Sequence, residues 1–207
     1  MSLAKLVWIS PEAEKHIAYC ARVSSSNQEN PEYAKLISYC IKHNHWSILE
    51  QANMCIEVNT SRAISAQILR HRSFNFQEFS QRYSSVQSCE VYEARRQDDK
   101  NRQNSISDMT SDEQKWFKEQ QQVVHENSER LYNIALKKGI AKEQARFLLP
   151  MSSSTKMYMN GTVRSWVHYI QVRTDESTQK EHRDIAEEIK KIFIKEMPII
   201  SNALGWV

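Results

Sequence analysis

The residues that could do chemistry are concentrated in one stretch of the chain, residues 67–83. Within it, Arg70, His71 and Arg72 follow one another, and Ser80 comes eight positions after the last of them. Several cationic side chains on an otherwise apolar segment cost free energy unless an anionic or electron-rich group meets them. The stretch therefore indicates an anion-binding site, and a solvated basic edge with salt bridges is the ordinary alternative.

Composition restricts what such a site could serve. The chain has 207 residues, of which 40% are hydrophobic, enough for one buried core, so we expect one domain over residues 1–207. The 28 basic residues are nearly balanced by 25 acidic ones, and the net charge is only +3. No global field therefore points to a nucleic-acid or membrane partner. Without a secretory leader or an apolar stretch of about 20 residues, the expected location is the cytoplasm.

The low glycine content excludes two common nucleotide-binding motifs. The chain has only three glycines, Gly139, Gly161 and Gly205, and they lie far apart. Neither the dinucleotide-binding pattern GxGxxG nor a Walker P-loop can be written with them. If a nucleotide binds to this protein, side chains must hold its phosphates, which returns attention to the arginines.

Cysteine and histidine patterns suggest neither a disulfide framework nor a metal centre. The chain has four cysteines, Cys20, Cys40, Cys55 and Cys89, with no CxxC pair among them. Free thiols in a reducing compartment are expected. Cys89 is a conceivable nucleophile, but no base stands near it in sequence. His43, His45 and Glu50 lack a further ligand at metal-binding spacing, so no metal is expected.

Periodicity and capping signals predict an α+β fold with several helices around a small, mostly antiparallel sheet. A Thr110-Ser-Asp-Glu113 capping box opens the longest predicted helix. The expected helices cover residues 11–23, 31–43, 62–71, 111–138, 141–149, 163–172 and 176–196, and the expected strands cover residues 54–60 and 155–159.

Helix geometry predicts how the polar residues gather. Gln67, Arg70 and His71 stand at i, i+3 and i+4 and would share one face of the helix over residues 62–71. We therefore expect these three side chains to form one polar patch on this helix.

A second polar group is predicted on the helix over residues 163–172. Arg164 and His168 are four residues apart and share a side, away from the apolar face of this helix. Thr162 can cap its start, and Arg173 falls at its end.

The segments between these elements are expected to be loops and turns. Residues 73–78 show no period, Asn160-Gly161 reads as a turn, and residues 79–84 could be extended, with Ser80, Arg82 and Ser84 on one face. Residues 93–109 are polar and almost free of apolar side chains. A loop of this length suggests a lid or a segment facing another subunit.

The ordered motifs resemble those of the flavin-dependent thymidylate synthases. The RHR-x7-S signature is present as Arg70-His71-Arg72 and Ser80. Further blocks follow in the family's order, so the resemblance spans most of the chain: Ala21-Arg-Val-Ser24, His45-x-Ser47-x-x-Glu50, Gln67, Ala145-Arg146-x-x-Leu149-Pro150, Arg164-Ser165 and His168-x4-Arg173. The family often has Asn where this chain has Thr162.

The resemblance implies a reaction. A one-carbon unit passes from methylenetetrahydrofolate to C5 of dUMP, and FAD reduced by NADPH supplies the hydride that completes the methyl group of dTMP. No protein thiol is needed. A homotetramer with active sites shared between subunits is also implied, without a nucleic-acid or membrane partner.

The resemblance also assigns residues. FAD would be bound by Ser47, Arg70, His71, Arg72, Glu78, Thr162, Val163, Arg164 and His168. The dUMP site would comprise Gln67, Arg70, Glu78, Phe79, Ser80, Gln81, Arg82, Arg146 and Arg173. Arg173 is the implied catalytic residue, because a guanidinium against the uracil edge stabilises the N3 anion and makes C5 more nucleophilic. Arg82 and Arg146 suit the phosphate dianion.

Two other functions remain open on the sequence alone. A nucleic-acid-binding module could use the arginine cluster, and it would bind polynucleotides with a steep salt dependence. A cysteine-dependent methyltransferase could use Cys89.

Overall fold

The computed structural model describes residues 3–84 and 88–207. Helices and strands are interleaved along the described residues. The elements are β1 (Ala4–Ile9), α1 (Ala13–Ala21), α2 (Ala34–Lys42), the 3-10 helix η1 (Trp46–Gln51), β2 (Asn53–Ser61), α3 (Arg62–Ile68), β3 (Asn75–Glu78), β4 (Arg96–Gln97), β5 (Ser105–Ile106), α4 (Ser111–Lys137), α5 (Lys142–Ala145), the 3-10 helix η2 (Arg146–Leu148), β6 (Ser154–Thr162), α6 (Val163–Arg173), α7 (Lys180–Glu196) and α8 (Pro198–Ala203).

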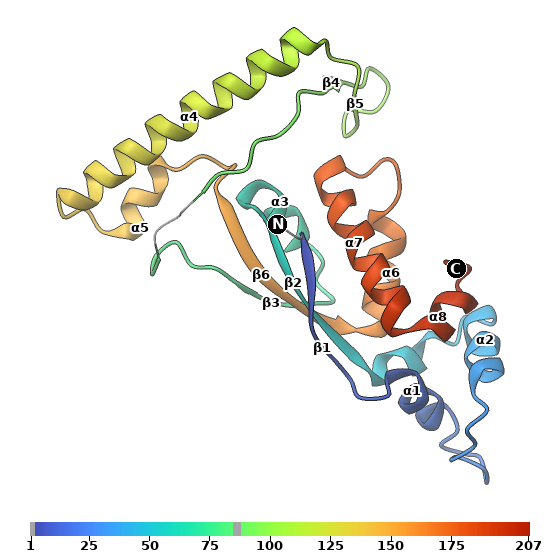
Figure 1. Cartoon of the computed structure of the whole chain (residues 1–207). Coiled ribbons are helices and arrows are strands. Elements are labelled where there is room, and N and C mark those ends of the chain that lie inside the picture. Colours follow the sequence, from blue (N-terminus) through green and yellow to red (C-terminus); the bar gives the residue numbers. More distant parts are fainter. Residues whose placement is uncertain (1–2, 85–87) are drawn as a thin grey trace.

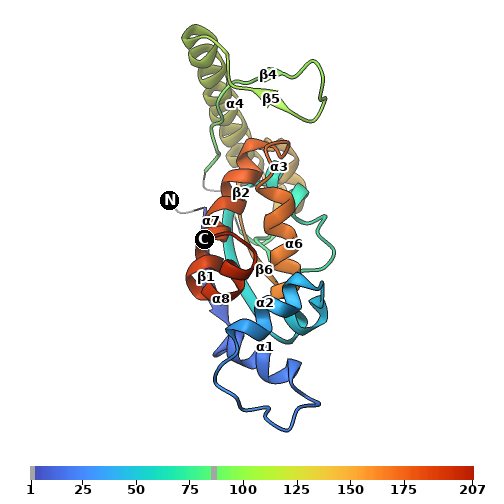
Figure 2. The ribbon, with the colours of Figure 1, turned by 90° about the vertical axis from the view of Figure 1, so that its right-hand side faces the viewer.

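Four of the strands form one antiparallel sheet in the order β1-β2-β6-β3. Residues of β6 alternate between buried and exposed, which is the pattern of a sheet covered on one face. Figures 1 and 2 show α6 and α7 lying across that face. The α+β prediction is therefore confirmed.

The core lies between this face of the sheet and the two helices. Met157 and Met159 of β6 meet Trp166 of α6 and Phe193 of α7, and all four side chains are fully buried. The indole N–H of Trp166 donates to the carbonyl oxygen of Met54 at 2.8 Å, so this large side chain is buried without an unpaired polar atom. The core thus fixes α6 on the sheet, and with it the polar residues that α6 carries.

Gly161 corrects one of the predicted turns. Asn160 and Gly161 lie inside β6, which continues to Thr162. The ring of Phe74 packs on Gly161, so closely that a Cβ atom there would stand 2.5 Å from Phe74 Cδ1. Glycine is required at this position for close packing and not for a turn.

The segment after the arginine cluster was also predicted wrongly. Residues 75–78 form β3, which pairs with β6, although a loop was expected there. Residues 79–84 are not extended: the carbonyl of Ser80 accepts from the N–H groups of Tyr83 and Ser84 in a turn. Ser80, Arg82 and Ser84 therefore do not share a strand face. The free edge of β6 supplied hydrogen bonds that no local pattern revealed.

Helix α3 ends at Ile68, three residues earlier than expected. Arg70 and His71 follow in a turn whose N–H groups donate to the carbonyl oxygens of Gln67 and Ile68. The predicted helical face of Gln67, Arg70 and His71 is therefore wrong in its geometry.

Helix α4 leaves the body of the protein as a long rod (Figures 1 and 2). Its capping box is confirmed: Thr110 Oγ1 accepts from the N–H of Glu113, whose carboxylate accepts from the N–H of Thr110. Val124 and Leu131, two of its apolar residues, are exposed. Tyr132 and Ala135 are buried against Ala145 of α5, but most of the other apolar residues of α4 are uncovered.

The polar segment before α4 contains only a small hairpin, β4 and β5. None of the described helices is both long and apolar enough to span a membrane.

Candidate functional site

The centre of the candidate site is a contact between Arg173 and His71. Arg173 is the last residue of α6, and its Nε–H donates to Nε2 of His71 at 2.8 Å. The imidazole also packs edge-on against Tyr169, with 4.9 Å between the ring centroids. A fixed imidazole thus orients the guanidinium, whose two Nη groups remain for other partners.

The contact requires a neutral His71. Burial lowers the pKa of His71 to about 4, and the positive charge of Arg173 acts in the same direction. Near pH 7 the ring therefore keeps a lone pair on Nε2 and accepts the hydrogen bond. The charge of Arg173 stays uncompensated, because its partner is neutral and no ion pair to it forms in the described part of the chain.

Behind this contact lies a buried histidine that the sequence analysis missed. His182 of α7 is fully buried, with Nε2 3.1 Å from the hydroxyl oxygen of Tyr169. Burial and the charge of Arg173 lower its pKa to about 3. A signal was present: His182, Ile185, Ile189 and Phe193 follow at steps of three or four, so His182 belongs to the inward stripe of α7.

A cleft of about 580 Å³ lies beside α6, at the second polar group that was predicted from the sequence. Arg164 and His168 both line it, as their spacing required. Trp46 and Glu50 of η1 line it too, and the Glu50 carboxylate pairs with Arg164. The cleft offers an indole surface, hydrogen-bond donors and one ion pair, a combination suited to a polar heteroaromatic ring.

Two of the predicted phosphate ligands meet at α5. Arg82, in the turn over residues 79–84, has Nε 3.7 Å from a carboxylate oxygen of Glu143. Arg146 donates from its own Nε to the carbonyl oxygen of Glu143 at 3.1 Å. Lys142 ties the turn to the helix by donating to the carbonyl oxygen of Tyr83. The turn and α5 therefore bring these cations together, although 64 positions separate them.

The turn itself explains the roles open to its other residues. Ser80 Oγ accepts from the N–H of Arg82 at 3.3 Å, so the hydroxyl hydrogen can still donate to an anion. Gln81 is buried, and the N–H of Phe79 donates to the carbonyl oxygen of Lys156. Of these three predicted dUMP ligands, Ser80 has the most accessible polar group.

Four predicted residues are already engaged within the chain. Glu78 pairs with Arg62 at 2.8 Å, and Gln67 donates to the side chain of Gln179 at 2.6 Å. Thr162 caps α6 by accepting from the N–H of Ser165. Val163 is fully buried in the core, and its N–H donates to the carbonyl oxygen of Ala52. In this chain alone, Val163 thus presents neither side chain nor N–H to the cleft.

Arg70, Arg72 and Ser47 are exposed. Neither arginine has a hydrogen-bond or salt-bridge partner for its side chain among residues 3–84 and 88–207. Ser47 lies on η1, next to Trp46 of the cleft. The chain thus holds three subsites, around Arg173, around α5 and beside α6, while the RHR arginines remain available to further partners.

Cysteine chemistry finds no support in the geometry. All four cysteines are free, and burial raises the pKa of the Cys89 thiol, which disfavours the reactive thiolate. Within the described ranges no three His, Cys, Asp or Glu side chains are grouped so that they could hold a metal ion.

Comparisons with known proteins agree on one family. The family model described as thymidylate synthase complementing protein matches residues 5–199. The chain is 58% identical over 198 residues to a flavin-dependent thymidylate synthase of Synechocystis, covering 96% of this chain and 91% of that protein. It is 56% identical to a probable flavin-dependent thymidylate synthase of Paramecium bursaria Chlorella virus 1, covering 94% and 92% of the two chains.

A solved structure has the same fold. The crystal structure of the UMP/dUMP methylase PolB from Streptomyces cacaoi, bound with 5-Br dUMP, superposes with a TM-score of 0.87 at 25% identity. The match covers 98% of this chain and 94% of that chain.

Proposed function

The chain belongs to the family of flavin-dependent thymidylate synthases, and from this premise we propose that it methylates dUMP reductively to dTMP. Methylenetetrahydrofolate donates the one-carbon unit, and NADPH is the reductant. The structural observation that carries the proposal furthest is the Arg173–His71 contact, which holds an uncompensated positive charge at the end of α6.

Arg173 is the proposed catalytic residue. Its guanidinium keeps its proton at any physiological pH, so it stabilises negative charge on the pyrimidine without titrating. Stabilising the N3 anion raises the electron density at C5, where the new carbon–carbon bond forms. His71 orients the guanidinium, because the one lone pair of its neutral imidazole accepts the Nε–H of Arg173.

The subsite at α5 is the proposed phosphate site. Arg82 lies near the carboxylate of Glu143, Arg146 donates to its carbonyl oxygen, and the hydroxyl of Ser80 is the neighbouring donor. A phosphate dianion would compete with the Glu143 carboxylate for Arg82, because their present separation of 3.7 Å is longer than a good charge-assisted hydrogen bond. Gln67, Arg70, Glu78, Phe79 and Gln81 complete the proposed nucleotide site.

The family's name implies a flavin, and the cleft beside α6 fits one end of FAD. The indole of Trp46 can stack on a ring, while Arg164 and His168 can donate to ring edges or phosphates. When bound, reduced FAD supplies the hydride. We assign Arg70, His71 and Arg72 to the same cofactor, together with Ser47, Glu78, Thr162 and Val163, as the resemblance implies.

We propose that the protein forms a homotetramer with shared active sites. Two features support this state: the RHR arginines lack partners within the described chain, and apolar side chains are uncovered on α4. Among the latter, Trp116 is 62% exposed and Val123 is 50% exposed. Burying such a patch against another copy is favourable. Light scattering should give four times the chain mass of 24.3 kDa.

The decisive experiment measures tritium release from C5-labelled dUMP. Purified protein should be yellow, and it should release tritium only when FAD, NADPH and methylenetetrahydrofolate are all present. A colourless protein that fails to bind added FAD would refute the proposal. The nucleic-acid alternative predicts salt-sensitive polynucleotide binding and indifference to dUMP, and no structural observation or comparison favours it. We place the activity in the cytoplasm.

A further inference from the structure

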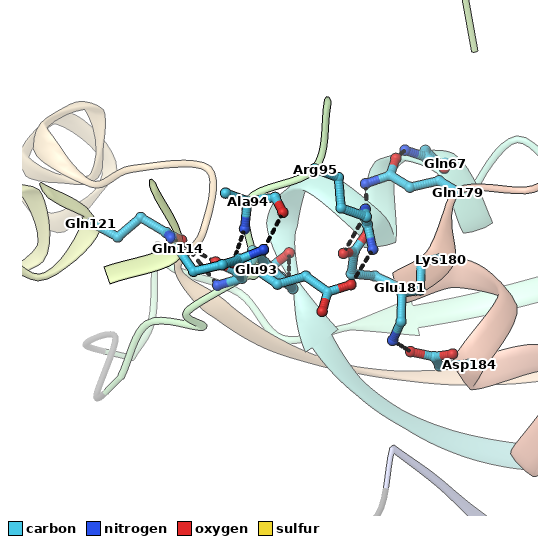
Figure 3. Close-up of polar contacts among 12 residues, drawn as sticks. Gln67, Glu93, Ala94, Arg95, Gln114, Gln121, Gln179, Lys180, Glu181 and Asp184 are labelled. Atoms are coloured by element: carbon cyan, nitrogen blue, oxygen red, sulfur yellow. Dashed lines mark hydrogen bonds and ion pairs between the residues drawn. The ribbon is translucent and has the colours of Figure 1, made fainter. Parts of the chain in front are cut away.

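A chain of side-chain hydrogen bonds leads from Gln67 to the polar segment before α4. Nε2 of Gln67 donates to Oε1 of Gln179 at 2.6 Å, and Nε2 of Gln179 donates to Oε2 of Glu181 at 2.8 Å. The other oxygen of Glu181 accepts from Nη2 of Arg95 at 2.5 Å. Figure 3 shows these four side chains in sequence, arriving from α3, the start of α7 and the segment over residues 92–95.

The far end of this chain is firmly held. The side chains of Arg95 and Glu181 are 9% and 13% exposed, so their ion pair is largely removed from water. The backbone N–H and carbonyl of Ala94 bond to the side-chain amide of Gln114 at 2.8 and 2.7 Å (Figure 3). Helix α4 therefore fixes the position of Arg95, and Arg95 fixes Glu181.

The chemistry of these side chains decides which group donates and which accepts in each hydrogen bond. A carboxylate can only accept hydrogen bonds, so the NH₂ group of Gln179 must face Glu181. The carbonyl oxygen of Gln179 then faces Gln67, which must offer its own NH₂ group. Oε1 of Gln67 is left as an acceptor, and it has no hydrogen-bond partner in the part of the chain that the structure describes.

We propose that Gln179 and Glu181 are positioning residues that make Gln67 a hydrogen-bond acceptor toward the bound nucleotide. This inference rests on the proposed function, in which Gln67 contacts dUMP. The group it recognises is a hydrogen-bond donor, and dUMP has two on its sugar and base: the 3′-hydroxyl, and N3–H as long as N3 keeps its proton. If Gln67 presented its NH₂ group instead, two hydrogen-bond donors would face each other and binding would weaken.

One substitution should reverse the direction of donation along this series of hydrogen bonds. In Glu181→Gln, the new amide must turn its oxygen to Arg95, because a guanidinium only donates. Its NH₂ group then donates to Gln179, whose own NH₂ turns to Gln67. Gln67 now presents NH₂ to the nucleotide. The double variant Gln179→Glu/Glu181→Gln restores the original direction, because a carboxylate at 179 again accepts from Gln67.

The experiment measures dUMP binding to the FAD-loaded enzyme by calorimetry, alongside kcat and KM. Glu181→Gln should weaken dUMP binding about tenfold and raise KM, with a much smaller change in kcat, and the double variant should recover to within about twofold of wild type. Glu93→Gln is the matched control: Glu93 also pairs with Arg95, at 3.2 Å, but lies outside the chain. It should bind dUMP like wild type.

Two nucleotide analogues identify the recognised donor. The penalty of Glu181→Gln should vanish with 2′,3′-dideoxy-UMP if the 3′-hydroxyl is the donor, or with N3-methyl-dUMP if N3–H is the donor. Equal losses in Glu181→Gln and Glu93→Gln, or no recovery in the double variant, would overturn the inference. If Gln67→Ala also leaves dUMP binding unchanged, the assigned dUMP contact of Gln67 itself fails.

Discussion

Replacing Gly161 by alanine should strain the core behind the active site. The added Cβ would lie 2.5 Å from Phe74 Cδ1 and 2.7 Å from Cε1, where ordinary contacts begin at 3.4 Å. The ring must therefore shift by roughly 1 Å. It has little room, because its centroid lies 4.7 Å from that of Trp166 and 6.4 Å from that of His71.

The expected cost is that of an overpacked core, about 1–3 kcal/mol. For a chain of this size, each kcal/mol lowers Tm by about 2–4 °C, so Gly161→Ala should melt about 2–12 °C below wild type. Urea unfolding followed by circular dichroism would give the same difference as a change in midpoint. Gly139→Ala is the control, since no atom lies within 4 Å of its added Cβ and only its φ of +81° opposes the substitution.

A double-mutant cycle with Phe74→Leu separates the clash from any backbone effect. In the Phe74→Leu background the added methyl group has space, so Gly161→Ala should cost at least 1 kcal/mol less than in wild type. Gly139→Ala should cost the same in both backgrounds. An unchanged cost of Gly161→Ala in the Phe74→Leu background would show that close packing is not why glycine stands in β6.

Four further outcomes are expected. Because His71 and His182 have folded pKa values of about 4 and 3, below the ordinary 6.5, the unfolded chain binds more protons. The free energy of unfolding should therefore fall as the pH drops from about 6.5 toward 4, by up to about 1.4 kcal/mol per pH unit for each histidine. His182→Gln should remove the contribution of His182 to this fall, as measured by urea midpoints at decreasing pH. Arg173→Lys should keep FAD but lose about 10²-fold or more in kcat, since a compact ammonium lacks the planar fork with which the guanidinium contacts His71 and reaches the pyrimidine. Cys89→Ala should retain tritium release, and its loss would revive the thiol mechanism. Thr110→Ala should cost about 1 kcal/mol and speed amide exchange in the first turn of α4.

Helices α1, α2, α3, α6 and α7 were predictable from sequence because each packs one side on a common core, whereas α8, a short helix that begins at Pro198, was missed. The buried stripe of α7 follows from residue spacing alone, and the start of α6 follows from the capping side chain of Thr162. Strand β3 was not predictable in this way, since three of its four residues are polar and its pairing partner lies in β6, about 80 positions away. Strand β1 was missed as well, because its apolar run is short and a register shift between Leu6 and Trp8 interrupts the pairing.

For the candidate site, the sequence predicted neighbours along one helix better than contacts between different elements. Arg164 and His168 share a cleft because four residues make one helical turn. The Arg173–His71 contact joins positions 102 apart and depends on the packing of α6 against the turn after α3. Gln179 and Glu181 carried no motif at all. Their proposed positioning role follows from the acceptor atom, Oε1, that their hydrogen bonds leave free on Gln67.

The pairing of arginines within the chain argues for where its anions bind. Arg62 and Arg95 have carboxylate partners within 3 Å, so their charges are satisfied internally. Arg70, Arg72, Arg146 and Arg173 have none within 4 Å among the described residues, and Arg82 has only a distant one. Uncompensated cations in a folded protein oppose stability unless ligands neutralise them. These five arginines are among the residues proposed to meet a nucleotide and a flavin, so bound dUMP and FAD should stabilise the fold together by more than either does alone, as measured by Tm. If the two ligands together raised Tm no further than one of them does alone, they would not neutralise separate cations, and the proposed assignment of these arginines to two anion sites would be wrong.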